Sequence, residues 1–361
     1  MTEDAFYSPA PVFLVDGEAK GELARDVLWL AVEESTLGLR TLEATFAAIG
    51  PGPGGVAPAP SYVDGAVLDF GRRLQVSIGR SGAEREVFDG AVSAVELHLA
   101  AGVLPKVTCF AEDALMRFRM TRRRARWERT TDADLARAVA ERHGMAADAD
   151  ADGPTYDVVH QWNQSDLAFL RDRARLVQAD VWADADGLHF VARSKRRGEE
   201  VELSGEHDVV RLDVRADLAH QRTSVEVRGY DAGQRQAVTA TAGKDVVEAE
   251  VTGGRLGVDV LGKAFDELPT MRSRDVPLTR EEADGFATAE MLRRARSFVT
   301  AAGEVRGRPE LSVGSRVTLT AVAPPFDGDG WYVTRVRHTY DLEDGHRTWF
   351  EAERATLTEG G

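Results

Sequence analysis

The feature that most constrains this 361-residue sequence is an internal repeat, in which four blocks from the first 115 residues recur in the same order further along the chain. Each block is weak alone: residues 92–114 and 333–355 align without a gap at an offset of 241, yet share only five of 23 residues. Unrelated β-rich segments have no reason to keep one block order, so the repeat predicts two related β domains. Generic strand patterning is the alternative. The other pairs are 26–32 with 208–214, 41–50 with 224–233, and 71–76 with 314–319.

Most of the chain has the pattern of half-buried strands. β-branched and aromatic residues recur in it with stretches of period two, which is typical of antiparallel sheets with one buried face. We expect strands in seven segments: 26–32, 73–78, 92–99, 208–214, 223–228, 316–320 and 331–340.

Three helices are expected between these strands. In the first, Thr130 or Thr131 can act as the N-cap, and Gly144 offers a left-handed end. The second is expected to begin after Ser165, which is its predicted N-cap. The third lies within about 281–302 and has one small apolar face, made by Ala287, Met291, Ala295 and Val299.

The second helix carries a continuous apolar stripe and is followed by a hairpin. The turn residues at 186–187 lie between two short apolar segments, which indicates two strands that fold back on each other. We expect this hairpin to pack on the helix through Trp182 and Phe190. The helical residues that would face it are Leu167, Leu170, Ala174 and Val177.

The repeat and the helices together divide the chain. We expect a first β domain at 1–115, an α+β insert at 116–200, and a second β domain in two parts, 201–235 and 305–361, separated by a helix-containing insert at 236–304. The second domain must then close through pairing between distant segments, which predicts comparatively slow folding.

The charge balance argues against a nucleic acid read by sequence. The chain has 45 basic and 60 acidic residues, a formal net charge of −15, whereas each contact with a phosphate backbone needs a local Lys or Arg. One basic stretch could contact a polyanion or an acidic protein, although a solvated pair of strands explains it equally well. Its members are Arg117, Arg119, Arg122, Arg123, Arg124, Arg126 and Arg129.

No motif predicts catalysis, a cofactor or a metal site. The glycine-rich segment 50–55 contains two prolines, which remove backbone donors that a pyrophosphate would need, so we expect a loop. Segment 148–153 opens like a calcium loop, but Val159 stands where a bidentate glutamate is required. The eight histidines include no pair at helical metal-binding spacing. We assign no catalytic, cofactor-binding or metal-ligating residue, and we expect Cys109 to be a small core residue.

The chain also lacks the patterns of a membrane or secreted protein. No apolar run approaches the ~20 residues that cross a bilayer. The N-terminus has neither the basic start nor the apolar core of a signal peptide. We therefore expect synthesis and assembly in the cytoplasm and no membrane partner.

Four stretches, 130–145, 161–190, 277–322 and 326–354, resemble segments of the late control protein D family of phage tails. This family includes the baseplate hub proteins of contractile phages and the hub portion of VgrG-type spike proteins. The stretch 161–190 is similar to its most recognisable segment, a Gln/Asn-rich entry into a helix followed by a hairpin that bears a tryptophan. The last stretch resembles its closing hairpin. The resemblance covers about residues 9–355.

The resemblance implies a β-rich α+β fold with two tandem, related, tube-like β-barrel domains, two α/β inserts and assembly as a homotrimer. It implies a structural, non-enzymatic baseplate hub that joins a hexameric inner tube to a trimeric spike or needle protein, among other baseplate components. We expect a hub without the OB-fold and needle of fused VgrG-type proteins, and therefore a needle supplied by another polypeptide. The sequence does not distinguish a phage tail, an extracellular contractile injection particle and a secretion apparatus. The alternatives are a tail-borne cell-wall hydrolase and a carbohydrate-binding β module.

Overall fold

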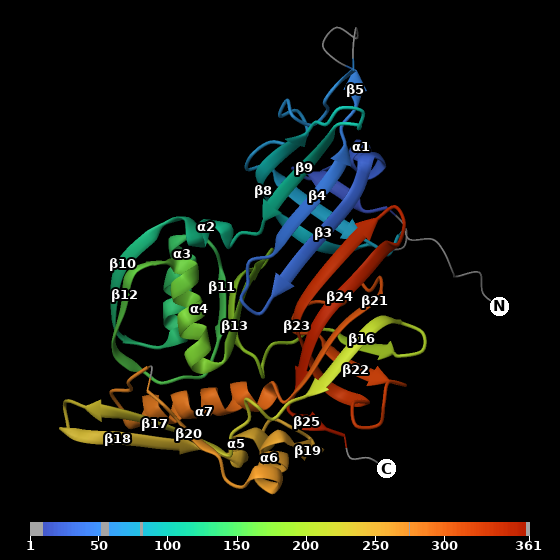
Figure 1. Ribbon diagram of the computed structural model, residues 1–361. Helices are drawn as coiled ribbons and strands as arrows, with labels where there is room; N and C mark the ends of the chain where they lie inside the picture. The colour runs from blue at the N-terminus through green and yellow to red at the C-terminus, as the bar shows by residue number, and fades with distance from the viewer. Residues whose placement is uncertain (1–9, 52–57, 80–81, 274, 359–361) are drawn as a thin grey trace.

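Thirteen strands join in one large sheet in the computed structural model, which describes residues 10–51, 58–79, 82–273 and 275–358 (Figure 1). The chain is β-rich, as the sequence predicts. Pairing in this sheet is antiparallel except between β15 (Glu200–Ser204) and β22 (Arg316–Thr320). The main path runs through β16 (Val209–Ala216), β21 (Val299–Arg306), β24 (Gly345–Arg354), β23 (Gly328–Asp341), β3 (Val27–Ser35), β4 (Thr41–Ala47), β9 (Lys106–Glu112), β8 (Arg85–His98), β7 (Arg73–Ile78), β1 (Val12–Val15) and β2 (Glu18–Ala19).

The sheet consists of two β units that meet where β23 pairs with β3. The first unit contains β1 to β4 and β7 to β9, and it encloses its own core around Phe13, Phe46 and Phe88. The second contains β15, β16 and β21 to β24, and its core includes Trp331 and Phe350. All seven expected strands are present. Shorter elements of the first unit are α1 (Gly21–Asp26), β5 (Gly50–Pro51) and β6 (Pro58–Ala59).

The long hairpins of the two units have the same register. Val92 of β8 pairs with Ala111 of β9, and Val333 of β23 pairs with Ala352 of β24, so the pairing keeps the offset of 241 seen in the sequence. Both long strands contain a bulge directly after this valine. The match at the level of hydrogen bonding confirms the predicted repeat for these blocks, because generic strand patterning would not conserve a bulge.

The side chain at each bulge makes the same bond. Ser93 Oγ donates to the carbonyl oxygen of Phe110 at 3.2 Å, and Thr334 Oγ1 donates to the carbonyl oxygen of Glu351 at 3.3 Å. A hydroxyl residue at this point supplies a donor where the bulge interrupts the ladder. The shared serine or threonine is therefore a local signature of the repeat.

The first repeated strand of each unit, β3 in the first and β16 in the second, is equivalent as well. Leu30 of β3 pairs with Ala44 of β4, and Leu212 of β16 pairs with Gly303 of β21. Each first strand has its bulge at the matching place, after Val27 and Val209. The predicted pairing of block 26–32 with 208–214 is thus confirmed, and β21 takes the position of β4.

The predicted match of block 41–50 with 224–233 was wrong. β17 (Ser224–Asp231) lies in a separate sheet between β18 (Gln236–Ala242) and β20 (Pro269–Arg272), and β21 supplies the second strand of the second unit. Residues 224–235 therefore lie outside the second β unit and residues 299–304 lie within it. The glutamate and glycine spacing that suggested the match is a property of two unrelated strands that share an alternating pattern.

The segments between the repeated strands form one lobe beside the large sheet (Figure 1). One hydrophobic core connects them, since Leu135 and Leu170 belong to the same cluster as Val225 and Phe286. The first part of the lobe contains α2 (Met116–Met120), β10 (Arg122–Thr130), α3 (Asp132–Arg142), β11 (Ala147–Asp150), β12 (Tyr156–Ser165), α4 (Asp166–Val177), β13 (Ala179–Asp184) and β14 (Gly187–Ala192). The second part adds α5 (Lys244–Glu248), β19 (Arg255–Leu256), α6 (Gly257–Phe265) and α7 (Arg280–Arg296), and β19 pairs with β25 (Thr356–Leu357).

The helix ends follow the sequence signals. Thr131 caps α3 by accepting a bond from the Asp134 amide, and the Asp134 carboxylate accepts one in return from the Thr131 amide, which completes a capping box. Ser165 caps α4 through the Ala168 amide at 3.2 Å. α7 ends at Arg296, so Val299 begins β21 and does not extend the helix.

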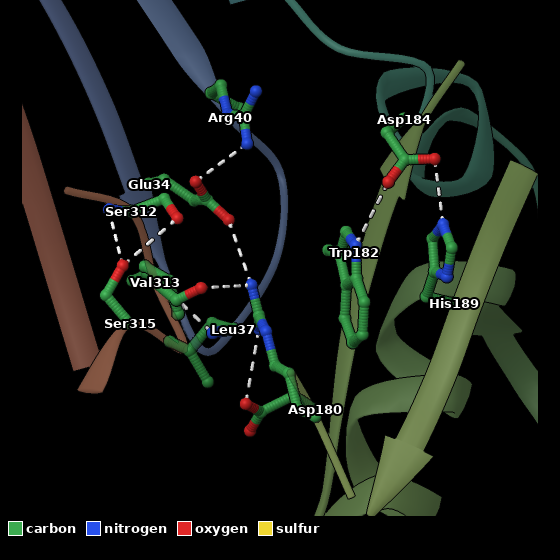
Figure 2. A network of polar contacts seen from close by, with 12 residues as sticks. Glu34, Leu37, Arg40, Asp180, Trp182, Asp184, His189, Ser312, Val313 and Ser315 are labelled. Carbon is green, nitrogen blue, oxygen red and sulfur yellow. Dashed lines mark hydrogen bonds and ion pairs between the residues drawn. The ribbon is translucent and has the colours of Figure 1, made fainter. Parts of the chain in front are cut away.

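The hairpin packs on α4 with one change from the expectation. Phe190 is fully buried in the lobe core with Leu170, and Val181, one residue before Trp182, supplies the other contact. Successive side chains of a strand point to opposite faces, so Trp182 faces away from the helix, stacks on His189 at 4.5 Å and bonds to Asp184 (Figure 2). The predicted packing of Trp182 on the helix was wrong.

Candidate assembly surfaces

Among the described residues, two unpaired strand edges of the large sheet lie at positions that the repeat makes equivalent to a paired junction. β16 lies at one end of the sheet and pairs with β21 only. β7 covers the Arg85–Ala91 half of β8, whereas the Ala94–His98 half pairs with β9 alone. A row of unpaired backbone N–H and C=O groups is a template for another strand. Both edges are therefore candidate surfaces for assembly.

The second unit shows how the equivalent edge is covered within one chain. In β23, the half from Arg335 to Asp341 pairs with β3 of the first unit. Arg335 Nε donates to Glu33 Oε1 at 2.9 Å across this junction. Since β8 corresponds to β23 and β16 corresponds to β3, the chain contains one complete junction and the two separate halves of a second.

Exposed apolar side chains extend the free edge of β8 toward the turn that leads into β9. Leu99 and Leu104 are 61% and 63% exposed, and Val210 at the other free edge is 50% exposed. Removing such surface from water on association is favourable by ~25 cal/mol per Å². The two edges thus carry apolar contact area in addition to backbone hydrogen-bonding groups.

A buried polar network holds the two β units and the lobe at fixed orientations (Figure 2). Glu34 Oε2 accepts from Arg40 at 2.8 Å, and Glu34 Oε1 accepts from Arg196 at 3.3 Å. Arg196 also donates to Asp180 at 3.2 Å and to the carbonyl oxygen of Val313 at 2.7 Å. These residues belong to β3, the segment after β14, β13 and the approach to β22, so the network joins every major part of the molecule.

A second buried carboxylate lies where the first unit passes into the lobe. Asp113 accepts bonds from the amides of Arg40 at 2.7 Å and Leu115 at 2.9 Å. Burial raises the pKa of Asp113 to about 6, and these two backbone donors oppose that shift. Asp113 fixes the turn between β9 and α2 and therefore the direction in which the lobe leaves the sheet.

The predicted basic stretch forms α2 and β10, and β10 pairs with β12 as a two-stranded ribbon. Arg122, Arg124 and Arg126 alternate on its exposed face. Arg123 faces the lobe, where its Nε lies 3.1 Å from the buried carboxylate of Asp166. The arrangement is that of a solvated pair of strands, one of the two interpretations open from the sequence.

The remaining sequence motifs have ordinary structural roles. Cys109 is fully buried in the first core, as predicted. Asp150 and Asp152 of the calcium-like segment are both ion-paired with Lys195, at 2.6 and 3.0 Å. Most of the glycine-rich segment 50–55 lies outside the described residues. Within the described ranges, no three His, Cys, Asp or Glu side chains gather as a metal-ligand set.

The sequence did not indicate the Glu34–Arg196 network. Its members come from four distant segments, and a single buried charge has no periodic signal in a sequence. The two free edges could have been found by applying the repeat offsets to the β23–β3 junction, but this requires knowing which strands pair.

The strand order and the paired β units define the fold of a phage-tail protein. The chain is similar to the 43 kDa tail protein of prophage MuSo2 from Shewanella oneidensis, with 13% identity, a TM-score of 0.69, and coverage of 96% of this chain and 98% of that one. It is similar to a tail protein from Neisseria meningitidis, with 12% identity, a TM-score of 0.65, and coverage of 96% and 97%. It also resembles the E. coli c3393 protein, described as a component of the type VI secretion system with similarity to the T4 tail proteins gp27 and gp5, at 12% identity, a TM-score of 0.57, and coverage of 97% and 75%.

A family model described as the Alg8 N-terminal domain matches residues 62–341, and the chain belongs to this family. This description differs from that of the late control protein D family, so membership in the latter stays a prediction. No curated protein matches the sequence. No helix in the described part of the chain is long and apolar enough to span a bilayer.

Proposed function

We propose that this protein is the structural hub of a contractile tail or injection particle, in which three copies form a ring of six β units. The observation that carries the proposal is the single complete junction between β23 and β3, together with the free halves of an equivalent one on β8 and β16. A second copy supplies the missing half at each of these two edges, and a closed ring covers both of them in every chain.

The internal junction gives the register of the proposed contact between copies. Within the chain, Arg337 lies opposite Glu33 and His338 lies opposite Val32. Applying the repeat offsets places Glu96 of β8 opposite Arg215 of the next copy's β16. The subsequent pairs are Leu97 with Val214, His98 with Asp213, and Leu99 with Leu212.

The charges in this register are complementary. Glu96 meets Arg215, and His98 meets Asp213, while leucine and valine residues alternate with them. Opposite charges and apolar pairs directly across two antiparallel strands stabilise pairing, and like charges disfavour it. A shift by one residue would bring Glu96 opposite Val214 and lose these contacts.

The domain division that we propose follows the strand order. One domain comprises residues up to 115, and the second combines residues 201–216 with 299–358. Residues 116–200 and 217–298 together form the lobe. Three such chains present six similar β units to a hexameric inner tube, while the lobes repeat only three times and suit a separate trimeric spike. We propose other baseplate components as further partners.

The aromatic residues favour the hub over a carbohydrate-binding module. A sugar-binding groove would expose several tryptophan and tyrosine rings together. Of the six tryptophans, Trp162 is the exposed one, whereas Trp331, Tyr332 and Tyr340 are buried in or beside the β cores. We propose no reaction for the protein, in keeping with its neighbours' description as tail proteins.

Engineered cysteines test the proposed contact. Directly opposed residues of antiparallel strands lie about 4.5–5.5 Å apart at Cα, within the range of a disulfide. We expect Leu97→Cys combined with Val214→Cys to give covalent trimers under oxidising conditions, and light scattering to give the mass of three chains. The control combines Leu97→Cys with Asp213→Cys, whose side chains would face opposite sides. A persistent monomer, or equal cross-linking of both pairs, contradicts the proposal.

A further inference from the structure

A cleft of about 970 Å³ lies between the second β unit and the second part of the lobe. β22, β23 and the end of β24 form one wall, and the segment from α5 to β19 forms the other. Four arginines line it: Arg193, Arg296, Arg316 and Arg354. The cleft is separate from both free strand edges, so a ligand could bind in it whether or not the chain forms a trimer.

Two of these arginines are neutralised within the chain. Arg193 forms an ion pair with Glu353, and its guanidinium carbon lies 3.9 Å from the ring centre of Tyr332. Arg296 Nε donates to Glu250 Oε2 at 2.9 Å. The carboxylates of Glu353 and Glu250 are therefore already paired, and neither forms an ion pair with the neighbouring Arg316.

Arg316 has no carboxylate within ion-pair distance among the described residues. Its Nη2 donates to the carbonyl oxygen of Arg193 at 3.4 Å, and its guanidinium carbon lies 4.6 Å from the ring centre of Tyr332. This single long bond uses one of the five N–H donors of a guanidinium group. Burial, and then the charges of Arg193 and Arg296, lower the pKa of Arg316 against the opposing effects of Tyr332 and Glu250.

The fourth arginine, Arg354, differs from Arg316 in its hydrogen bonding. Arg354 also forms no ion pair in the described part of the chain, but it donates to the carbonyl oxygens of Pro325, Asp327, Asp329 and Thr356. Its donors are therefore satisfied by the protein. Arg316 differs because, among the described residues, the protein accepts only one of its N–H donors. A half-buried cation without a carboxylate partner is costly unless an anion joins it.

We propose that this cleft binds a carboxylate group through the guanidinium of Arg316. The planar fork of an arginine matches two oxygens of such a group at once. Tyr332 holds the fork in place, since its hydroxyl is bonded to Asp180 and its ring is buried. Thr356 and Thr358 line the same cleft, and the Thr358 hydroxyl donates to the carbonyl oxygen of Asp327, so the guanidinium of Arg316 is the donor on which the proposal rests.

Two carboxylates at the cleft predict whether a second variant will strengthen or weaken anion binding. Glu200 is exposed and lies opposite Arg316 in the β15–β22 pairing, and Asp329 of β23 also lines the cleft. Their negative charges repel an incoming anion. Neutralising Glu200 should therefore strengthen binding, which an unspecific loss of structure could not do.

The experiment is calorimetric titration of the full chain with two probes: citrate, and a hexaglutamate peptide with blocked ends. We expect binding of at least one probe, weakened about 10- to 100-fold by Arg316→Gln, since a hydrogen bond to a charged group is lost. Glu200→Gln should tighten it. Arg228→Gln, which removes an exposed arginine on β17 outside the cleft, should leave it unchanged.

The two probes separate the sources of the anion. Binding of citrate indicates a free small carboxylate, and binding of the peptide alone indicates an acidic side chain of a partner protein. The unfolding temperature of Arg316→Gln serves as a control for folding, because removal of an uncompensated charge should not lower it. Absence of binding by both probes, or binding that Arg316→Gln does not change, overturns the proposal.

Discussion

The guanidinium of Arg196 lies 3.3 Å from Glu34 Oε1, and both side chains are at least 92% buried. Removing one partner of such a pair leaves a buried charge, so Arg196→Ala should lower the free energy of unfolding by about 3–5 kcal/mol. Urea denaturation measures it. The control is Arg85→Ala, which breaks the exposed pair with Glu199 and should have a much smaller effect, because solvent screens exposed ion pairs. Equal effects would mean that the buried network does not hold the two β units together.

Charge reversal tests the register proposed between copies. Glu96→Arg alone and Arg215→Glu alone should each weaken the trimer, because each places like charges opposite one another, and the double variant should restore it. Sedimentation velocity over a range of concentrations measures the effect. Arg228→Glu, on a strand outside the large sheet, is the control and should leave assembly unchanged. Failure of the double variant to recover would place the contact elsewhere.

Two buried histidines give the stability a pH dependence. His338 Nδ1 lies 3.3 Å from His346 Nε2 and 3.2 Å from Thr348 Oγ1, and His338 Nε2 lies 3.1 Å from the carbonyl oxygen of Leu311. Burial lowers the pKa of His338 to about 3, with smaller contributions from His346 and Arg40, and burial alone lowers that of His346 to about 4.

The sign follows from proton uptake by the unfolded chain. The pKa of a histidine in the unfolded chain is about 6.5, so below this pH the unfolded histidines gain protons that the folded pair does not. As the pH decreases, the free energy of unfolding should therefore fall by up to about 1.4 kcal/mol per pH unit for each histidine. Asp113, with its raised pKa of about 6, opposes this between about pH 4 and 6. The urea midpoint, measured between about pH 5 and 7, should depend less on pH in the His338→Gln variant than in the unmodified protein. An unchanged slope would assign the dependence to other groups.

The lobe core depends on the stripe of α4. Leu170 is fully buried among Leu135, Phe190 and Phe286, so Leu170→Ala should lower the free energy of unfolding by about 2–5 kcal/mol. Leu342→Ala, at a position that is 70% exposed, should change it by no more than about 0.5 kcal/mol. Thermal unfolding of the two variants compares them directly. Similar losses of stability in the two variants would contradict the conclusion that the apolar stripe of α4 is buried in the lobe core.

Local signals in the sequence predicted local structure well. Thr131 and Ser165 cap their helices because a side-chain oxygen next to free amides is a short-range interaction. The registers of 92–114 and 333–355 were predictable for a different reason. A hairpin fixes the pairing of strands that are adjacent in sequence, so similar blocks give similar hairpins.

The sequence did not correctly predict which distant strands pair with one another. β17 and β21 both alternate buried and exposed residues, and this pattern cannot distinguish which of them pairs with β16 and β24. The choice depends on how each strand packs against the rest of the chain, since α7 covers β17 and places it in the lobe. The predicted packing of Trp182 was wrong by a single residue, because neighbouring residues of a strand point to opposite faces of the sheet.

The junction between β23 and β3 also has a consequence for synthesis. β4 follows β3 directly, but Arg335 is made 302 residues after Glu33, which takes roughly 15–60 s at about 5–20 residues per second. Throughout that interval the ribosome-bound first unit presents one bare edge of β3. A finished β23 from a neighbouring chain fits this edge as well as the chain's own strand does, and that exchange produces domain-swapped dimers. We therefore expect slower translation to increase the fraction of chains that pair with a neighbour before they close on themselves.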